Sequence, residues 1–178
     1  MNYSVRRGGK RDPPFESLRD THDRSAFSCG VDPLDRYFRE RAGQDLRRRL
    51  STVFVLFDTA NGAVAGYYSL SSCQIEPSSL PVELARRLPR RPLPATLIGR
   101  LAVDLQYRGR GLGRGLLADA LIRAADASRD IGAMAVIVDA KNDQARAFYE
   151  HFGFRRFVDD PHRLFLPMSD AEQYAQED

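Results

Sequence analysis

Glycine and arginine alternate in the stretch QYRGRGLGRGLL, which runs from residue 106 to 117. The residues that follow predict a helix over 111–130, because apolar side chains recur there at a period of 3.6 residues: Leu112, Leu116, Leu117, Ala120, Leu121 and Ala124. A helix N-terminus carries unpaired N–H groups and the positive end of the helix dipole. Glycines let that backbone approach a ligand closely. The pattern therefore predicts a cradle for a polyanion such as a diphosphate, with Arg108, Arg110 and Arg114 adding charge at its rim.

Two common phosphate loops do not match this stretch. A Walker A loop needs Lys-Ser/Thr after its last glycine, and that pair is absent here. A dinucleotide fingerprint needs glycines at the spacing G-x-G-x-x-G, whereas Gly109, Gly111 and Gly113 lie two residues apart. The acid expected about 20 residues later at a strand end is also missing. A glycine loop of this kind is weak support for nucleotide binding when taken alone.

The elements around the loop predict an α/β (α+β) fold with a mixed, mostly antiparallel central sheet flanked by helices. Strand-like and helix-like segments alternate in the order β-α-β-β-(α)-β-α-β-α-β-β. The first half of the chain predicts a helix 32–49, with Asp32 as N-cap and Pro33 in its first turn, and then a strand 51–58, a hairpin turn at Asn61-Gly62 and a strand 64–76. A short helix 78–88 and an arginine-bearing loop 89–94 lead to a strand 95–104, the helix 111–130 and a strand 133–140. The last predicted segments are a helix 142–153, capped by Asn142 or Asp143 and ended by Gly153, and a hairpin of 154–160 with 162–167.

Length and composition favour one globular domain. The chain has 178 residues, 43% of them hydrophobic and 29% charged. We expect a flexible N-terminal arm over 1–13, a single domain over 14–168 and an acidic C-terminal tail over 169–178. No apolar run approaches the roughly 18 residues of a membrane span, and the basic N-terminus lacks the apolar stretch of a secretory signal. The two cysteines, Cys29 and Cys73, have no metal-ligand spacing, so no metal site is expected, and two thiols in a reducing cytoplasm are favoured over one disulfide.

Basic residues gather in the middle of the chain. Residues 81–115 carry eight arginines against Glu83 and Asp104, whereas residues 168–178 carry four acids and no base. Such a basic segment attracts phosphate. Arginine also supplies 25 of the 27 basic residues of the whole chain, so a solvated arginine face remains the alternative for any single member.

Two segments resemble a known family. GRLAVDLQYRGRGLGRGLLADAL is similar to the acetyl-CoA-binding segment of GNAT N-acetyltransferases, whose pattern Gln/Arg-x-x-Gly-x-Gly/Ala is matched by Arg108, Gly111 and Gly113. NDQARAFYEHFGF resembles the second signature of the same family, an Asn-led helix that ends in Phe-Tyr-x-x-Phe-Gly-Phe. Upstream, FSCGVDPLDRYF and GYYSLSS resemble a narrower group, the acetyltransferase toxins of bacterial toxin–antitoxin pairs, which acetylate the amino acid on charged tRNA.

The resemblance implies acetyl-CoA as donor and assigns roles to individual residues. Main-chain groups of the preceding strand would meet the thioester carbonyl and the pantetheine arm, and the loop amides would bind the diphosphate. The implied donor-binding residues are Leu101, Ala102, Val103, Arg108, Gly109, Arg110, Gly111, Leu112, Gly113, Arg114 and Asn142. Tyr149 stands where the family keeps its general acid, although its spacing with Ala145, Phe148 and Phe152 also fits an apolar core stripe. Asn142 is an equally good N-cap.

No general base falls in a matched motif. His22, His151 and His162 are candidates by chemistry alone, and each fits a structural or surface role better. A lysine amine, with a pKa of about 10.4, needs a base, whereas an α-amino group has a pKa of about 7.7–8.0. An active site without a strong base therefore fits an α-amine acceptor.

The leading hypothesis is a cytoplasmic toxin that acetylates the α-amino group of aminoacyl-tRNA and so blocks translation. Phosphate contacts are expected first at Arg86, Arg87, Arg90 and Arg91, and second at Arg47, Arg48 and Arg49. Arg100 is expected to point into the acceptor cleft or to pair with an acid. The implied partners are the tRNA, a cognate antitoxin with a ribbon-helix-helix half, and a second copy in a homodimer, with no membrane. The alternatives are an N-acetyltransferase for a small-molecule amine or a protein N-terminus, and a non-catalytic acyl-CoA-binding regulatory module.

Overall fold

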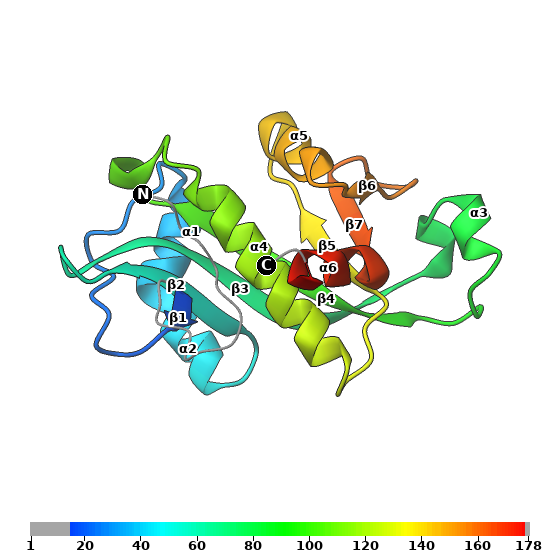
Figure 1. Cartoon of the computed structure of the whole chain (residues 1–178), viewed down its shortest axis with the longest axis horizontal. Helices are drawn as coiled ribbons and strands as arrows, with labels where there is room; N and C mark the ends of the chain where they lie inside the picture. Colours follow the sequence, from blue (N-terminus) through cyan, green and yellow to red (C-terminus); the bar gives the residue numbers. More distant parts are fainter. Residues whose placement is uncertain (1–14, 177–178) are drawn as a thin grey trace. The chain divides into compact units, whose positions relative to one another are not determined.

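Residues 15–176 are described by the structure, which is a computed structural model of the chain (Figure 1). The expected arm over 1–13 lies outside these residues. The elements in chain order are β1 (Phe15–Ser17), α1 (Asp32–Arg36), the π-helical turn η1 (Tyr37–Arg41), α2 (Ala42–Arg47), β2 (Thr52–Asp58), β3 (Ala63–Ile75), the 3-10 turn η2 (Pro77–Ser79), α3 (Val82–Ala85), β4 (Leu93–Val103), the 3-10 turn η3 (Leu105–Tyr107), α4 (Leu112–Ser128), β5 (Ala135–Asp139), α5 (Asp143–His151), β6 (Arg155–Arg156), β7 (Arg163–Pro167) and α6 (Met168–Gln176).

The sheet is mixed and mostly antiparallel, as the sequence predicts. Its strands follow the order β1-β2-β3-β4-β5-β7-β6. β1 with β2, β2 with β3, β5 with β7 and β6 with β7 pair antiparallel, whereas β4 and β5 pair in parallel over Thr96–Ile98 and Val136–Val138. The parallel pair is the one joined by a crossover helix, α4, because parallel neighbours need a long connection.

The described chain divides into two compact units. The first comprises 15–71 and Arg100–Ala120, and the second comprises Ser72–Gly99 and 121–176. In the first unit, Phe38 of η1 stacks on Tyr67 of β3 with ring centroids 4.2 Å apart, and α2 lies beside β2 (Figure 1). These contacts bury the apolar side of the α1–α2 segment against the strands.

The second unit has its own apolar core. Ile137 of β5 and Phe165 of β7 are fully buried there together with Phe157. Helix α6, drawn in red, lies beside β5 and β7 (Figure 1). Within the acidic C-terminal segment, Met168–Gln176 form this helix, because Met168 and Ala171 find an apolar surface to cover.

Several local predictions are confirmed in detail. All six residues of the predicted stripe on α4 are buried. Gly62 and Gly153 have φ angles of +64° and +89°, as a hairpin turn and a helix end require. Asp32 as N-cap is wrong by one position: Val31 occupies the cap without a side-chain bond, and Asp32 is already helical. The predicted helix 78–88 is shorter than expected, with η2 and α3 in its place.

Both cysteines are free thiols, Cys29 buried and Cys73 half-buried. Among residues 15–176, no helix combines the length and apolar character that a membrane crossing demands.

Candidate functional site

The glycine loop between β4 and α4 lies in the first unit and presents open backbone. Gly109 and Gly111 have φ angles of +76° and +73°, in the left-handed region that favours glycine. A Cβ atom added at either position would meet no atom within 4 Å. Helix α4 begins immediately afterwards at Leu112. The loop therefore offers both the bare backbone and the helix N-terminus that a diphosphate needs.

One side of the loop is held by the segment 27–30. The carboxylate of Asp104 accepts hydrogen bonds from the backbone N–H groups of Ser28 and Gln106, each 2.9 Å long. The N–H of Leu105 donates to the carbonyl of Ser28 over 2.8 Å. The guanidinium of Arg108 donates to the carbonyl of Cys29. The predicted donor-binding residue Arg108 is thus engaged in holding the loop in shape.

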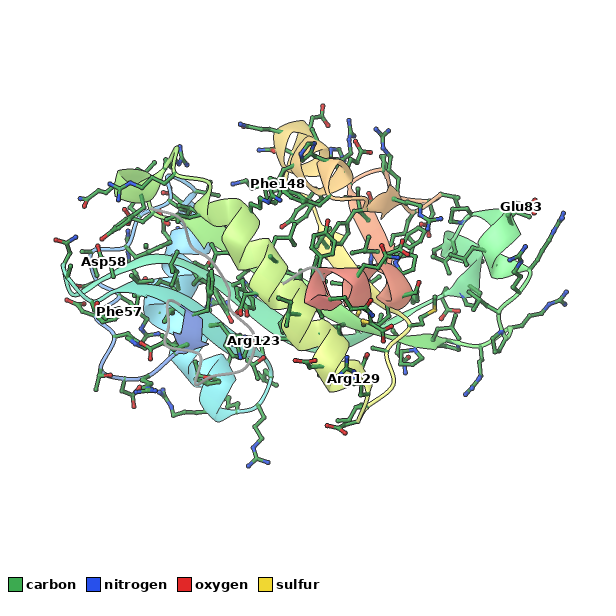
Figure 2. The ribbon with its side chains drawn as sticks, viewed as in Figure 1. Phe57, Asp58, Glu83, Arg123, Arg129 and Phe148 are labelled. Carbon is green, nitrogen blue, oxygen red and sulfur yellow. The ribbon has the colours of Figure 1, made fainter. Side chains whose placement is uncertain are left out.

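The end of β2 also contacts the segment that leads into the loop. The hydroxyl of Tyr107 donates to a carboxylate oxygen of Asp58 over 2.7 Å, and this bond lowers the pKa of Asp58 below its usual value. Figure 2 labels Asp58 at the end of β2. The guanidinium of Arg110 lies 5.1 Å above the Tyr107 ring. Arg110 therefore packs against the loop while it remains exposed.

The other predicted donor-binding residues of this unit flank the loop. Ala102 is buried at the end of β4, whereas Leu101 and Val103 are half-buried. Gly113 and Arg114 lie in the first turn of α4. Arg114 is exposed and forms no ion pair within the described chain. It is free to add positive charge beside the loop.

Tyr149 lies on α5, in the second unit. It is 8% exposed, and its ring meets Phe148 and Phe154 edge to face at 5.2 and 5.5 Å; Phe148 is labelled on α5 in Figure 2. No residue between 15 and 176 hydrogen-bonds its hydroxyl. Burial, with the negative charge of Asp139 as a smaller cause, raises the pKa of Tyr149 above its usual value. The ring is part of an apolar stripe, as its spacing predicts, and the hydroxyl remains protonated and available.

Asn142 is the N-cap of α5, which is one of the two roles that the sequence allows it. Its side-chain oxygen accepts a 2.8 Å hydrogen bond from the N–H of Ala145. The cap starts α5 at Asp143, and so sets the register that places Tyr149 on the buried side of the helix.

The four arginines of the α3 loop are all exposed. Arg86 forms one exposed ion pair, 3.7 Å long, with Glu83, which Figure 2 labels on α3. The other three form none with residues of the described chain: Arg87, Arg90 and Arg91. In the first unit, Arg47 pairs with Asp20 at 3.7 Å. The α3 loop thus presents positive charge that the protein itself leaves mostly unneutralised.

Arg100 and the histidines that the sequence offered as candidate bases contact neighbouring rings, backbone groups or carboxylates. Arg100 lies over the ring of Tyr37, 3.5 Å from its centroid. Buried His22 accepts from the N–H of Arg19 through Nδ1 and lies 2.8 Å from Glu16 through Nε2. His162 lies 2.9 Å from a carboxylate oxygen of Asp143. The ring of His151 meets that of Phe152 at 5.2 Å. Within residues 15–176, none of the three histidines makes a hydrogen bond or ring contact with Tyr149.

Sequence reasoning missed two buried carboxylates, Asp35 and Asp104, that contact the segment 27–30. A signal for Asp104 was present, since an aspartate directly after a strand often accepts from the N–H two residues on. Asp35 gave no such signal, because its partners precede its helix.

Comparisons with known proteins agree on one family. Residues 15–154 match the model of the Acetyltransferase (GNAT) family. A tRNA-acetylating toxin of Mycobacterium tuberculosis is 41% identical over 154 residues, which cover 86% of this chain and 91% of the relative. Probable toxin TacT of Sinorhizobium fredii is 32% identical over 156 residues, which cover 83% and 86%.

Solved structures of two further toxins share the fold. A tyrosine-to-phenylalanine mutant of KacT superposes with a TM-score of 0.85 at 28% identity, covering 89% of this chain and 96% of its own. AtaT complexed with acetyl-methionyl-tRNAfMet gives 0.83 at 29% identity, with the same coverage. An AtaT mutant bound to the C-terminus of the antitoxin AtaR and acetyl-CoA gives 0.75 at 26% identity, covering 89% and 95%.

Proposed function

The chain belongs to the GNAT family of acetyltransferases, and we propose that it is a toxin that acetylates the α-amino group of aminoacyl-tRNA. The observation that carries this proposal is the 41% identity to a tRNA-acetylating toxin over nearly the whole of both chains. The likeness to AtaT complexed with acetyl-methionyl-tRNAfMet supports it. Acetylation would remove the free amine on which translation depends.

Acetyl-CoA is the acetyl donor of this family, and the loop of the first unit fits its diphosphate. The open backbone at Gly109 and Gly111 and the N–H groups at the start of α4 supply donors for the diphosphate oxygens. Arg114 adds positive charge beside them. Main-chain groups of Leu101, Ala102 and Val103 at the end of β4 bind the pantetheine arm and polarise the thioester carbonyl.

Tyr149 protonates the leaving sulfur. The carbon–sulfur bond of the thioester breaks as a carbon–nitrogen bond forms to the acceptor, so the sulfur gains a proton and the amine loses one. Supporting this role, the hydroxyl of Tyr149 accepts or donates no hydrogen bond within residues 15–176, and burial keeps it protonated at neutral pH. Asn142 caps α5 through its side-chain oxygen and is also proposed to contact the donor arm.

The acceptor amine needs no strong base. An α-amino group has a pKa of about 7.7–8.0, and the electron-withdrawing ester of an aminoacyl-tRNA lowers it further. A large fraction of the amine is therefore neutral and nucleophilic at physiological pH, and water accepts its proton. The exposed Arg86, Arg87, Arg90 and Arg91 bind the tRNA phosphates.

The proposal extends to partners and location. A cognate antitoxin neutralises the enzyme, in line with the AtaT mutant bound to the C-terminus of AtaR, and its other half is a ribbon-helix-helix DNA-binding domain. The toxin is a homodimer and acts in the cytoplasm, where charged tRNA is found.

The decisive experiment incubates the purified chain with acetyl-CoA and total charged tRNA, followed by mass identification of the acetylated residue. We expect N-acetylated aminoacyl-tRNA from the wild type and a rate about 10²–10⁴-fold lower from Tyr149→Phe. Tyr174→Phe, which removes a hydroxyl from the same unit, should retain activity. Acetylation confined to small amines or protein N-termini would refute the tRNA proposal.

A growth assay tests the toxin role separately. Expression of the wild type should arrest bacterial growth, and expression of Tyr149→Phe should not. Equal growth with both proteins would contradict the toxin role.

A further inference from the structure

We propose that Asp35 and Asp104 are positioning residues that hold the acetyl-CoA loop in its binding conformation. Neither carboxylate belongs to the loop. Both bind the backbone of the segment 27–30, and Asp104 also binds the N–H of Gln106 in the turn before the loop. This inference rests on the proposed assignment of the loop 108–113 to the diphosphate.

Asp104 joins two pieces of chain that are remote in sequence. Its carboxylate is 7% exposed. One oxygen accepts from the N–H of Ser28 and the other from the N–H of Gln106, both at 2.9 Å. Its own N–H donates to the carbonyl of Ala65 over 2.9 Å. Asp104 therefore fixes the turn that leads into the glycine loop against both β3 and the segment 27–30.

Asp35 binds the same segment, 27–30, from helix α1. It lies in α1, is 4% exposed, and accepts from the N–H of Cys29 over 2.7 Å and from the hydroxyl of Ser28 over 3.2 Å. The carbonyls of Ser28 and Cys29 then accept from the N–H of Leu105 and the guanidinium of Arg108. The segment is thus locked between α1 and the loop.

Gly30 lets the segment turn beside the loop. Its φ angle is +78°, in the left-handed region that favours glycine. An added Cβ would meet Leu105 and Arg108 at ordinary contact distances of 3.4 and 3.6 Å, so the backbone angle rather than the space calls for glycine.

The physical benefit is preorganisation. A loop with glycines at 109 and 111, just before α4, has many accessible conformations, and ordering them on binding would weaken the affinity for the donor. Hydrogen bonds accepted by buried carboxylates select one conformation before the donor arrives. Donor affinity, rather than the chemical step, should depend on Asp35 and Asp104.

The two carboxylates should differ in their tolerance of asparagine. Both partners of Asp104 are backbone N–H donors, so the amide nitrogen of Asp104→Asn would face a donor and leave it without an acceptor. The amide of Asp35→Asn can accept from the N–H of Cys29 and donate to the hydroxyl of Ser28, because a hydroxyl also accepts. Asp35→Asn should therefore keep the lock, whereas Asp35→Ala should lose it.

The test measures KM and kcat of the full chain with acetyl-CoA and with S-acetylpantetheine, which lacks the diphosphate. We expect Asp104→Asn and Asp35→Ala to raise the KM for acetyl-CoA about tenfold, with kcat and the KM for S-acetylpantetheine nearly unchanged. Asp35→Asn should stay within about twofold of the wild type. Asp32→Asn is the matched control, since Asp32 lies in the same helical turn but is exposed and accepts no side-chain hydrogen bond within the described chain.

Four outcomes would overturn the inference. An unchanged KM in Asp104→Asn and Asp35→Ala would show that the carboxylates do not position the loop, and equal losses with both donors would show a general structural defect. Should Asp104→Asn fail to fold, the pair Asp35→Ala and Asp35→Asn decides the question, and equal KM values for those two variants would contradict the lock. A wild type that binds acetyl-CoA no better than S-acetylpantetheine would refute the loop assignment itself, and this inference with it.

Discussion

Tyr149 is a core residue by its spacing and packing, and we propose a catalytic role for its hydroxyl. Its ring packs against Phe148 and Phe154 as a core residue does, while its hydroxyl has no partner within 15–176. A buried tyrosine usually satisfies its hydroxyl with a hydrogen bond. The apolar stripe holds the ring in place and leaves the hydroxyl available for the proposed reaction.

The pH dependence of the rate follows from this environment. Because burial raises the pKa of Tyr149, the protonated donor persists to a higher pH than in a free tyrosine, whose pKa is about 10. We expect kcat/KM to rise with pH as the acceptor amine loses its proton, and then to stay level to about pH 9.5. Initial rates from about pH 6 to 9.5 would check this. A fall below about pH 9 would argue against Tyr149 as the acid.

At the scale of elements, the closest packing is where β3, β4 and α4 meet in the first unit. A Cβ atom on Gly66 would lie 2.8 Å from a methyl carbon of Leu116 and 2.9 Å from the carbonyl oxygen of Ala102. The glycine therefore lets α4 lie close to the two strands.

Gly66→Ala should destabilise the protein by about 1–3 kcal/mol, because the backbone carbonyl of Ala102 cannot move aside as a flexible side chain would. Urea unfolding measures this change in the free energy of unfolding. Gly132→Ala is the control, since open space surrounds that position, and it should be nearly neutral. Equal stability of Gly66→Ala and the wild type would contradict the packing argument.

At the scale of the whole molecule, charge is unevenly distributed along the sequence. The arginines at 86–91 follow a helix of only four residues, α3, and stay exposed with one weak ion pair among them. Exposed ion pairs contribute little to stability. The exposed cluster is therefore consistent in charge with the proposed tRNA contacts.

Replacement of Arg86, Arg87, Arg90 and Arg91 by glutamine should weaken tRNA binding and flatten its salt dependence. Each lost phosphate contact reduces the slope of log K against log salt by roughly 0.7–0.9. The affinity for acetyl-CoA should not change, which serves as the internal control. Titrations at several salt concentrations measure the slope. An unaltered slope would move the tRNA surface elsewhere, with Arg47, Arg48 and Arg49 as the next candidates.

The order of the elements, the glycine loop and the stripe on α4 were determined by the sequence alone. Periodicity, turn residues and caps act between near neighbours, so Leu112 to Ala124, Gly62 and Asn142 could be interpreted without a fold. Helix α6 and the shortened α3 could not, because tertiary packing decides whether a weak segment becomes helical. The partners of Asp35, Asp104 and Arg108 were likewise decided only by the tertiary structure. Ser28 and Asp104 are 76 positions apart, and Cys29 and Arg108 are 79 apart; a hydrogen bond over such a separation exists only once the core has brought the two segments together.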